Sequence, residues 1–232
     1  MTESYVGRDN LEAMKLAINY NAALAQLVHT HSPGREALDF GAGAGVFSSL
    51  LKRRGVNVTC VEPDEALFTE LKAMGFAAFR GIDEVPTASL VYVFSLNVLE
   101  HIHDDALVLR QIFERLRPGG RLLLYVPAFA ILFSAMDRRV GHFRRYRRKS
   151  LTALLQHVGF VIDDARYADS LGFLATLVYK VVGDPDGGLN TKSLTFYDRY
   201  VFPVSRFIDV ALRGAIGKNL IVVAHKAHAA RG

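Results

Sequence analysis

Short apolar runs alternate with amphipathic segments along most of this sequence, and this alternation restricts the fold more than any other feature. Such alternation is typical of βαβ units, in which each helix returns the chain to a parallel sheet. We therefore expect an α/β fold, a doubly wound and mostly parallel seven-stranded sheet with helices on both faces. The predicted strands are residues 36–40, 56–62, 76–81, 89–96, 121–127, 161–168 and 219–226, with helices at 46–55, 63–75, 103–120 and 149–160.

The 232 residues are expected to form a single domain, 1–232, with two additions to the alternating pattern. Apolar residues at helical spacing predict an N-terminal helix over 9–30, with Asp9 as its N-cap. Residues 169–218 hold two apolar, helical pieces around an Asp-Pro-Asp-Gly-Gly loop. We interpret this segment as an insertion before the last strand.

Cysteine content and hydrophobic run length indicate the compartment. Cys60 is the only cysteine, which excludes an internal disulfide and fits a reducing cytoplasm. No stretch reaches about 18 uncharged apolar residues, and the first residues lack the basic and then apolar pattern of a signal peptide. We therefore expect a cytoplasmic protein without a transmembrane segment.

The positive charge is concentrated in one run. Residues 138–149 carry seven cationic side chains and no acid, and without them the net charge of +5 becomes −2. Nucleic-acid binding proteins usually combine several basic clusters with exposed aromatic platforms, whereas we expect Phe143 and Tyr146 to pack inward. The pattern argues against nucleic acid. It favours a small anionic or polyhydroxylated ligand, or else a solvated face.

A glycine cluster lies where the first predicted strand meets its helix. Residues 39–45 read Asp-Phe-Gly-Ala-Gly-Ala-Gly, and such glycines let the backbone approach a ligand closely. Glu62 ends the next strand about twenty residues later, where doubly wound folds place a carboxylate that accepts hydrogen bonds from ribose hydroxyls. The combination predicts a nucleoside-containing ligand. The alternative is a tight turn beside a surface glutamate.

Five segments make the chain resemble the class I S-adenosylmethionine-dependent methyltransferases. They are ALDFGAGAG, VEPDE, GIDEVP, SLNVLEHI and LRPGGRLLLYVP. The resemblance covers nearly the whole chain and implies a Rossmann-like sheet whose last strand is antiparallel. It also implies S-adenosyl-L-methionine as cofactor, bound across the carboxyl ends of the strands. The cofactor-binding residues that it implies are Asp39, Gly41, Ala42, Gly43, Glu62, Ile82, Asp83 and Leu96.

Within that resemblance each part of the cofactor has its own contacts. Gly41, Ala42 and Gly43 would pack on the methionine part, which Leu96 would also line. Glu62 would hold both ribose hydroxyls. Ile82 and Asp83 would touch the adenine.

Candidate catalytic residues follow the fourth and fifth strands. Methyl transfer from a sulfonium needs an aligned acceptor and, for a hydroxyl, removal of its proton. Glu100, His101 and the later His142 resemble the metal site of ubiquinone-pathway O-methyltransferases and small-RNA terminal ribose methyltransferases, where a divalent ion polarises the acceptor oxygen. Those families carry Glu-x-x-Glu-His, and here Asn97 replaces the first glutamate, a weaker ligand for a hard cation.

Three interpretations of His142 stay open: a ligand of a divalent cation such as Mg²⁺, a metal-free general base, or a structural histidine. In the last case Glu100, His101 or Tyr146 would be the base.

The resulting hypothesis is an O-methyltransferase that acts on a small molecule, with a saccharide or a lipid-linked precursor among the candidates. The alternatives are a C- or N-methyltransferase and a nonenzymatic nucleotide-binding or membrane-surface module. An apolar insertion leaves surface that a monomer rarely exposes. We therefore expect residues 169–218 to cover the acceptor pocket or to form a two-fold homodimer interface.

Overall fold

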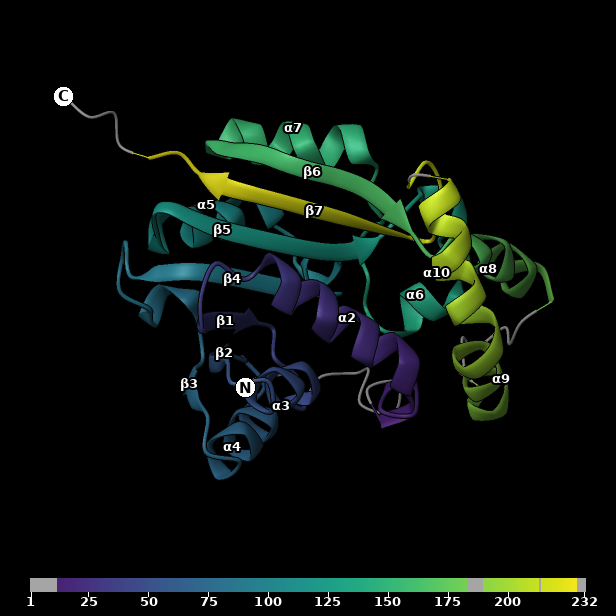
Figure 1. The fold of residues 1–232 in the computed structure, drawn as a ribbon, viewed down its shortest axis with the longest axis horizontal. Coiled ribbons are helices and arrows are strands. Elements are labelled where there is room, and N and C mark those ends of the chain that lie inside the picture. The colour runs from purple at the N-terminus through teal and green to yellow at the C-terminus, as the bar shows by residue number, and fades with distance from the viewer. Residues whose placement is uncertain (1–11, 183–189, 213, 229–232) are drawn as a thin grey trace.

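The computed structural model describes residues 12–182, 190–212 and 214–228, and its centre is a seven-stranded sheet (Figure 1). The strand order is β3-β2-β1-β4-β5-β7-β6, and only β7 runs antiparallel to its neighbours. The doubly wound sheet with an antiparallel last strand is therefore confirmed. The strands are β1 (Glu36–Phe40), β2 (Asn57–Val61), β3 (Ala77–Phe79), β4 (Leu90–Leu96), β5 (Leu116–Pro127), β6 (Phe160–Ala168) and β7 (Asn219–Lys226).

Helices cover both faces of the sheet and divide its apolar side chains into two cores. Helices α5 and α7 pack on one face, while α2, α3 and α4 pack on the other, as a parallel sheet requires. These helices are α2 (Ile18–His31), α3 (Val46–Lys52), α4 (Glu65–Ala73), α5 (Asp105–Arg115) and α7 (Arg148–Val158). Shorter elements in the connections are η1 (Ile82–Glu84), η2 (Leu99–His101), η3 (Ala130–Leu132) and α6 (Ala135–Arg139).

Two predicted helices have different bounds in the structure. Residues 15–17 interrupt the helix expected over 9–30, so α2 begins at Ile18, and the expected cap Asp9 lies outside the described residues. The helix expected over 103–120 ends at Arg115, because Leu116 already pairs with Leu90 and the following residues extend β5. The strand pairing between Leu116 and Leu90 thus outweighs the turn that the local sequence Arg-Pro-Gly-Gly predicts.

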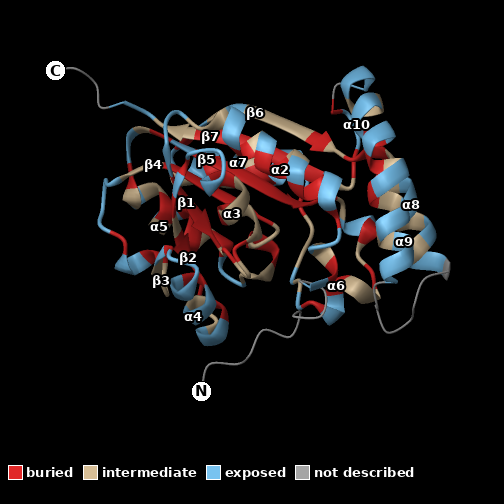
Figure 2. Ribbon diagram, turned by 60° about the horizontal axis from the view of Figure 1, so that its bottom comes forward, coloured by how far each residue is buried: buried red, intermediate tan, exposed pale blue. Residues whose placement is uncertain are grey.

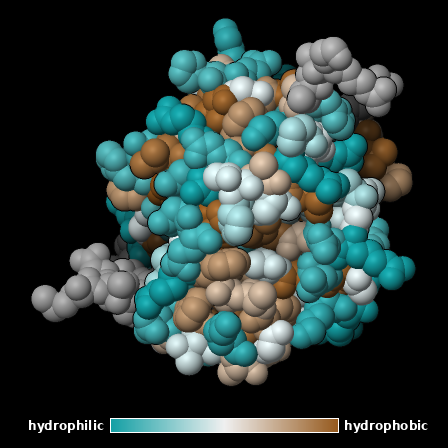
Figure 3. Space-filling view, turned by 90° about the vertical axis from the view of Figure 1, so that its left-hand side faces the viewer, coloured by the Kyte–Doolittle hydropathy of each residue, from teal (hydrophilic) through white to brown (hydrophobic). Residues whose placement is uncertain are grey.

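The inserted segment forms a layer of helices at the carboxyl edge of the parallel strands (Figure 1). It contains α8 (Ser170–Val182), α9 (Thr191–Phe196), the π-helical turn η4 (Tyr197–Val201) and α10 (Phe202–Ala211). On the opposite edge of the molecule, hydrophobic and hydrophilic residues are interspersed (Figure 3). Within the described residues, no helix combines the length and hydrophobicity needed to cross a membrane.

A carboxylate from this layer caps helix α2. Asp198, which is buried, accepts hydrogen bonds from the backbone N–H groups of Asn19 and Tyr20 at 2.9 and 2.8 Å. These N–H groups lie in the first turn of α2, where no earlier carbonyl of the helix can accept from them. Asp198 therefore acts as an N-cap supplied from a distant part of the sequence.

Candidate active site

The glycine cluster forms a tight turn at the end of β1 that leaves no room for side chains. Gly41 has φ of +81°, and a Cβ at this position would lie 2.5 Å from Val98. The N–H groups of Gly41 and Ala42 both donate to the carbonyl of Val61, at 2.9 and 3.1 Å. The turn is thus fixed between β2 and the segment after β4, where the doubly wound fold binds its ligand.

Glu62 lies directly after β2 and faces this turn. One carboxylate oxygen accepts from the N–H of Gly43 at 2.8 Å, and the other accepts from Asp64 at 3.0 Å. Burial raises the pKa of Glu62, while these two backbone hydrogen bonds oppose the shift. Each oxygen keeps a lone pair for a ribose hydroxyl, and the clamp itself stays a prediction.

Asp39 is hydrogen-bonded to helix α3. Its carboxylate is 2% exposed and accepts a hydrogen bond of 2.6 Å from the hydroxyl of Ser48 in α3. Burial raises the pKa of Asp39 to about 7. The structure thus shows Asp39 joining β1 to α3, and its role in cofactor binding stays a prediction.

The other expected cofactor contacts lie at neighbouring strand ends. Leu96 is the last residue of β4 and is buried. Asp83 is exposed in η1. Ile82 is buried in the hydrophobic core rather than exposed on a ligand surface, so its contact with the adenine stays a prediction.

The turn after β4 places an unpartnered carboxylate in the interior. Glu100 is completely buried in η2, and neither of its carboxylate oxygens has a hydrogen-bond partner among the residues that the structure describes. Burial raises its pKa to about 8, so the side chain is mainly protonated at neutral pH. An isolated buried group of this kind is costly to stability, which marks it as a functional candidate.

His142 lies beside Glu100 and is oriented by a second carboxylate. Its Nδ1 is 2.7 Å from Oδ1 of Asp137, and its Nε2 is 3.7 Å from Oε1 of Glu100. Burial alone would raise the pKa of Asp137, but hydrogen bonds from His142 and Arg145 outweigh it and hold that pKa well below its usual range. Because an ionised carboxylate only accepts, Nδ1 must carry a proton, and in the neutral imidazole the lone pair is then on Nε2.

His101 completes the group that the sequence predicted. Its ring meets the ring of His142 edge-on, with the centroids 4.5 Å apart. Burial lowers its pKa to about 4, so it is neutral at working pH. Each of Glu100, His101 and His142 offers one atom that could bind a metal, and these three atoms lie within 4.8 Å of one another.

Two of the seven cations in the basic run form structural ion pairs, whereas the cations at 138, 139 and 147–149 are exposed. Arg145 binds both oxygens of Asp137, at 2.8 and 3.0 Å. Arg144 pairs with Asp105, which also accepts from the hydroxyl of the buried Tyr146. This agrees with Tyr146 packing inward.

The expectation that Phe143 packs inward is wrong. The side chain of Phe143 is 55% exposed. Its backbone N–H donates to the carbonyl of Glu100 at 2.8 Å, and its ring meets the ring of His103 edge-on.

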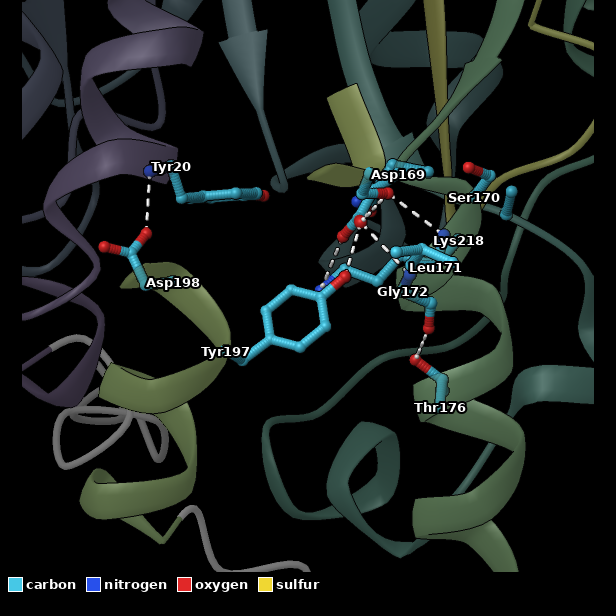
Figure 4. Close-up of polar contacts among 12 residues, drawn as sticks. Tyr20, Asp169, Ser170, Leu171, Gly172, Thr176, Tyr197, Asp198 and Lys218 are labelled. Atoms are coloured by element: carbon cyan, nitrogen blue, oxygen red, sulfur yellow. Dashed lines mark hydrogen bonds and ion pairs between the residues drawn. The ribbon is translucent and has the colours of Figure 1, made fainter. Parts of the chain in front are cut away.

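Sequence reasoning missed a polar cluster where the inserted helices meet the sheet (Figure 4). Asp169 is buried and accepts from the hydroxyls of Tyr197 and Ser205, and Lys218 is 3.3 Å from its other oxygen. The ammonium of Lys218 also lies over the ring of Tyr20. These residues come from four separate segments, and no local motif connects them.

The cluster continues toward the turn after β4. Asn97 has φ of +55° and donates from its side-chain amide to the hydroxyl of Tyr20 at 3.3 Å. The cluster therefore extends from Lys218 through Tyr20 to the segment that carries Glu100.

Comparison with known proteins identifies relatives of the chain. A family model described as a methyltransferase domain matches residues 13–165. The chain is 31% identical over 155 residues to a ubiquinone biosynthesis O-methyltransferase of Pseudomonas aeruginosa, covering 56% of this chain and 66% of the relative. It is 28% identical over 142 residues to a probable S-adenosylmethionine-dependent methyltransferase of Mycolicibacterium smegmatis, covering 56% and 54%. The match thus spans about half to two thirds of these relatives.

Solved structures share the architecture at lower identity. A SAM-dependent methyltransferase from Archaeoglobus fulgidus superimposes with a TM-score of 0.61 and 16% identity, covering 90% of this chain and 94% of the other. At this level of identity the likeness supports the fold alone.

Proposed function

Because the chain belongs to the methyltransferase-domain family and is a class I S-adenosylmethionine-dependent methyltransferase, we propose that it methylates a hydroxyl oxygen of a small molecule. The donor supplies a methyl group on a positively charged sulfur. A new C–O bond forms as the C–S bond breaks, and the hydroxyl proton passes to the enzyme. The family membership replaces the nonenzymatic interpretation.

The observation that carries the proposal is the Asp137–His142 pair, which lies next to Glu100 of the turn after β4. Asp137 fixes the imidazole with Nδ1–H donated at 2.7 Å, which leaves the lone pair of Nε2 to take the acceptor proton. Because Glu100 is mainly protonated at neutral pH, it adds little negative charge beside Nε2. Val98, two residues before Glu100, occupies the space beside Gly41, so the turn after β4 adjoins the glycine turn.

The same three side chains fit a divalent cation as an alternative. Within the described part of the chain, both oxygens of Glu100 lack hydrogen-bond partners, and the imidazoles of His101 and His142 offer nitrogen ligands. A bound cation would polarise the acceptor oxygen and lower its pKa. In that case Asp137 would orient a ligand rather than a base.

The acceptor is expected to be anionic or polyhydroxylated, as the basic run suggested. Most support now comes from the polar cluster of Lys218, Tyr20 and Asn97 at the carboxyl edge. Arg144 and Arg145 are less available because both bind buried carboxylates. The cytoplasmic location and the homodimer expected from the sequence stay predictions.

The test is a panel of phenols, sugars and lipid-linked saccharides, scored by release of S-adenosylhomocysteine and by the position of the methyl group in the product. Wild type and His142→Ala are compared with added magnesium and with chelator. We expect methylated oxygen in the product and a loss of roughly a hundredfold in turnover for the variant. Activity that persists in chelator favours the base, and activity that requires magnesium favours the cation. Methylation only at nitrogen or carbon would refute the proposal.

A further inference from the structure

The inserted helices expose an unusual number of large apolar side chains. On α8 they recur at one helical face, with Leu174, Val178 and Val181 exposed by 57, 61 and 83%. On the continuous rod α9–η4–α10 they follow the same spacing. This second stripe consists of Phe196, Tyr200, Val204, Phe207 and Val210, exposed by 51 to 80%.

The two stripes lie on one layer of the molecule. Helices α8 and α10 contact each other, and the sides of α8, α9 and α10 turned away from the sheet are largely exposed (Figure 2). Ile131, which is 60% exposed, adjoins them because its carbonyl accepts from Lys180 of α8. We call this surface the helical face, defined by Ile131 and the exposed apolar side chains of α8, α9 and α10.

The charges of the same helices are sorted by sign. The cationic side chains on them are Lys180, Lys192, Arg199 and Arg206, and all four are exposed. The acidic side chains that the structure describes on these helices are Asp198 and Asp209. Both are turned inward, because each accepts from two backbone N–H groups. Asp184 and Asp186 lie outside the described residues.

We propose that the helical face docks on the surface of an anionic phospholipid bilayer. Exposed aromatic and aliphatic side chains would enter the boundary between headgroups and acyl chains, while the surrounding cations contact lipid phosphates. A second copy of the chain fits the described face less well. A two-fold contact would place the same cations opposite one another without an exposed carboxylate to pair with them.

The helical face lies close to the carboxyl edge of the sheet, so docking affects what can reach that edge. The layer stands at the carboxyl edge of the sheet, where the polar cluster of Asp169, Tyr197 and Lys218 lies. Docking would thus bring this edge to the lipid surface. The proposal concerns the surface alone and does not depend on which atom the enzyme methylates.

The experiment is cosedimentation of the purified full chain with vesicles of phosphatidylcholine alone, or mixed with phosphatidylglycerol, at low and high salt. The apolar variant is Phe207→Ser with Val210→Ser, matched by Met74→Ser with Leu107→Ser, which are exposed elsewhere. The charge variant is Lys192→Glu with Arg206→Glu, matched by Arg53→Glu with Arg54→Glu at another exposed site. Circular dichroism checks that each variant is folded, and light scattering gives its oligomeric state.

We expect binding to the anionic vesicles that weakens at high salt and falls at least about tenfold in both face variants, while the matched controls bind like wild type. Absence of binding to anionic vesicles overturns the proposal, as does equal loss in the controls. A dimer that dissociates in the apolar variant, without any vesicle binding, assigns the face to a second copy instead.

Discussion

Replacing Asp137 by asparagine should disable His142 while keeping the shape of the site. The carboxylate is 1% exposed and accepts from five donors: two atoms of Ser134, two of Arg145 and Nδ1 of His142. An amide nitrogen in place of either oxygen must face at least one of these donors. If it takes the position of Oδ1, it donates to Nδ1 of His142 and drives the imidazole proton to Nε2.

The size of the effect follows from two losses, that of the proton acceptor and that of the buried ion pair with Arg145. The tautomer change removes the proton acceptor, and a general base typically contributes a factor of about 10² to 10⁴ to the rate. Breaking the buried pair with Arg145 should lower the free energy of unfolding by about 3 kcal/mol. The same result is expected if His142 is a metal ligand, because Nε2–H cannot coordinate a cation.

Three measurements check this prediction. Turnover is measured with the acceptor found in the panel, cofactor affinity by calorimetry, and the His142 tautomer by nitrogen-15 NMR, which needs no acceptor. Asp105→Asn is the matched control, because Asp105 binds Tyr146 and Arg144 but not the imidazole. An Asp137→Asn enzyme with turnover within a few-fold of wild type, and with Nδ1 still protonated, would refute the reasoning.

Three further predictions concern the cofactor turn and the fold. Glu62→Ala should weaken S-adenosylmethionine binding by roughly 2 kcal/mol, measured by calorimetry against the exposed control Glu65→Ala; unchanged affinity contradicts the clamp. Because burial raises the pKa of Asp39 to about 7, the folded state keeps a proton that the unfolded state loses above pH of about 4. Asp39 should therefore lower stability as pH rises toward 7, by up to about 4 kcal/mol. Asp39→Asn should remove that slope in denaturant titrations without cofactor, and an unchanged slope argues against it. Asp198→Ala should lower the free energy of unfolding by about 2 kcal/mol, because it leaves two N–H groups without an acceptor. The control Asn190→Ala, which removes an exposed cap, should lower it by about 1 kcal/mol or less; equal losses show that the long-range cap adds nothing.

The sequence predicted those parts of the molecule that local patterns determine. The bounds of β1 and β7 agree to the residue, since each is a short apolar run bounded by turn residues. The grouping of Glu100 with His142 was also expected, because both follow adjacent parallel strands at one sheet edge.

The sequence could not predict the features that depend on contacts between distant segments. Asp137 is the partner of His142, and the only local signal for it was a capping box with Ser134. Asp198 caps the start of α2, and the apolar pattern of residues 9–30 gives no sign of this distant carboxylate. The exposure of Phe143 was also not predicted, because a basic run does not indicate which way a single aromatic ring faces.

The cap from Asp198 also bears on how the chain folds during synthesis. Asn19 and Tyr20 leave the ribosome nearly 180 residues before the carboxylate that caps them. Contacts of such high sequence separation form late, because loop closure must precede any gain from them. On a nascent chain the first turn of α2 therefore stays frayed, and the edge that carries Tyr20 is completed only after α10 has emerged.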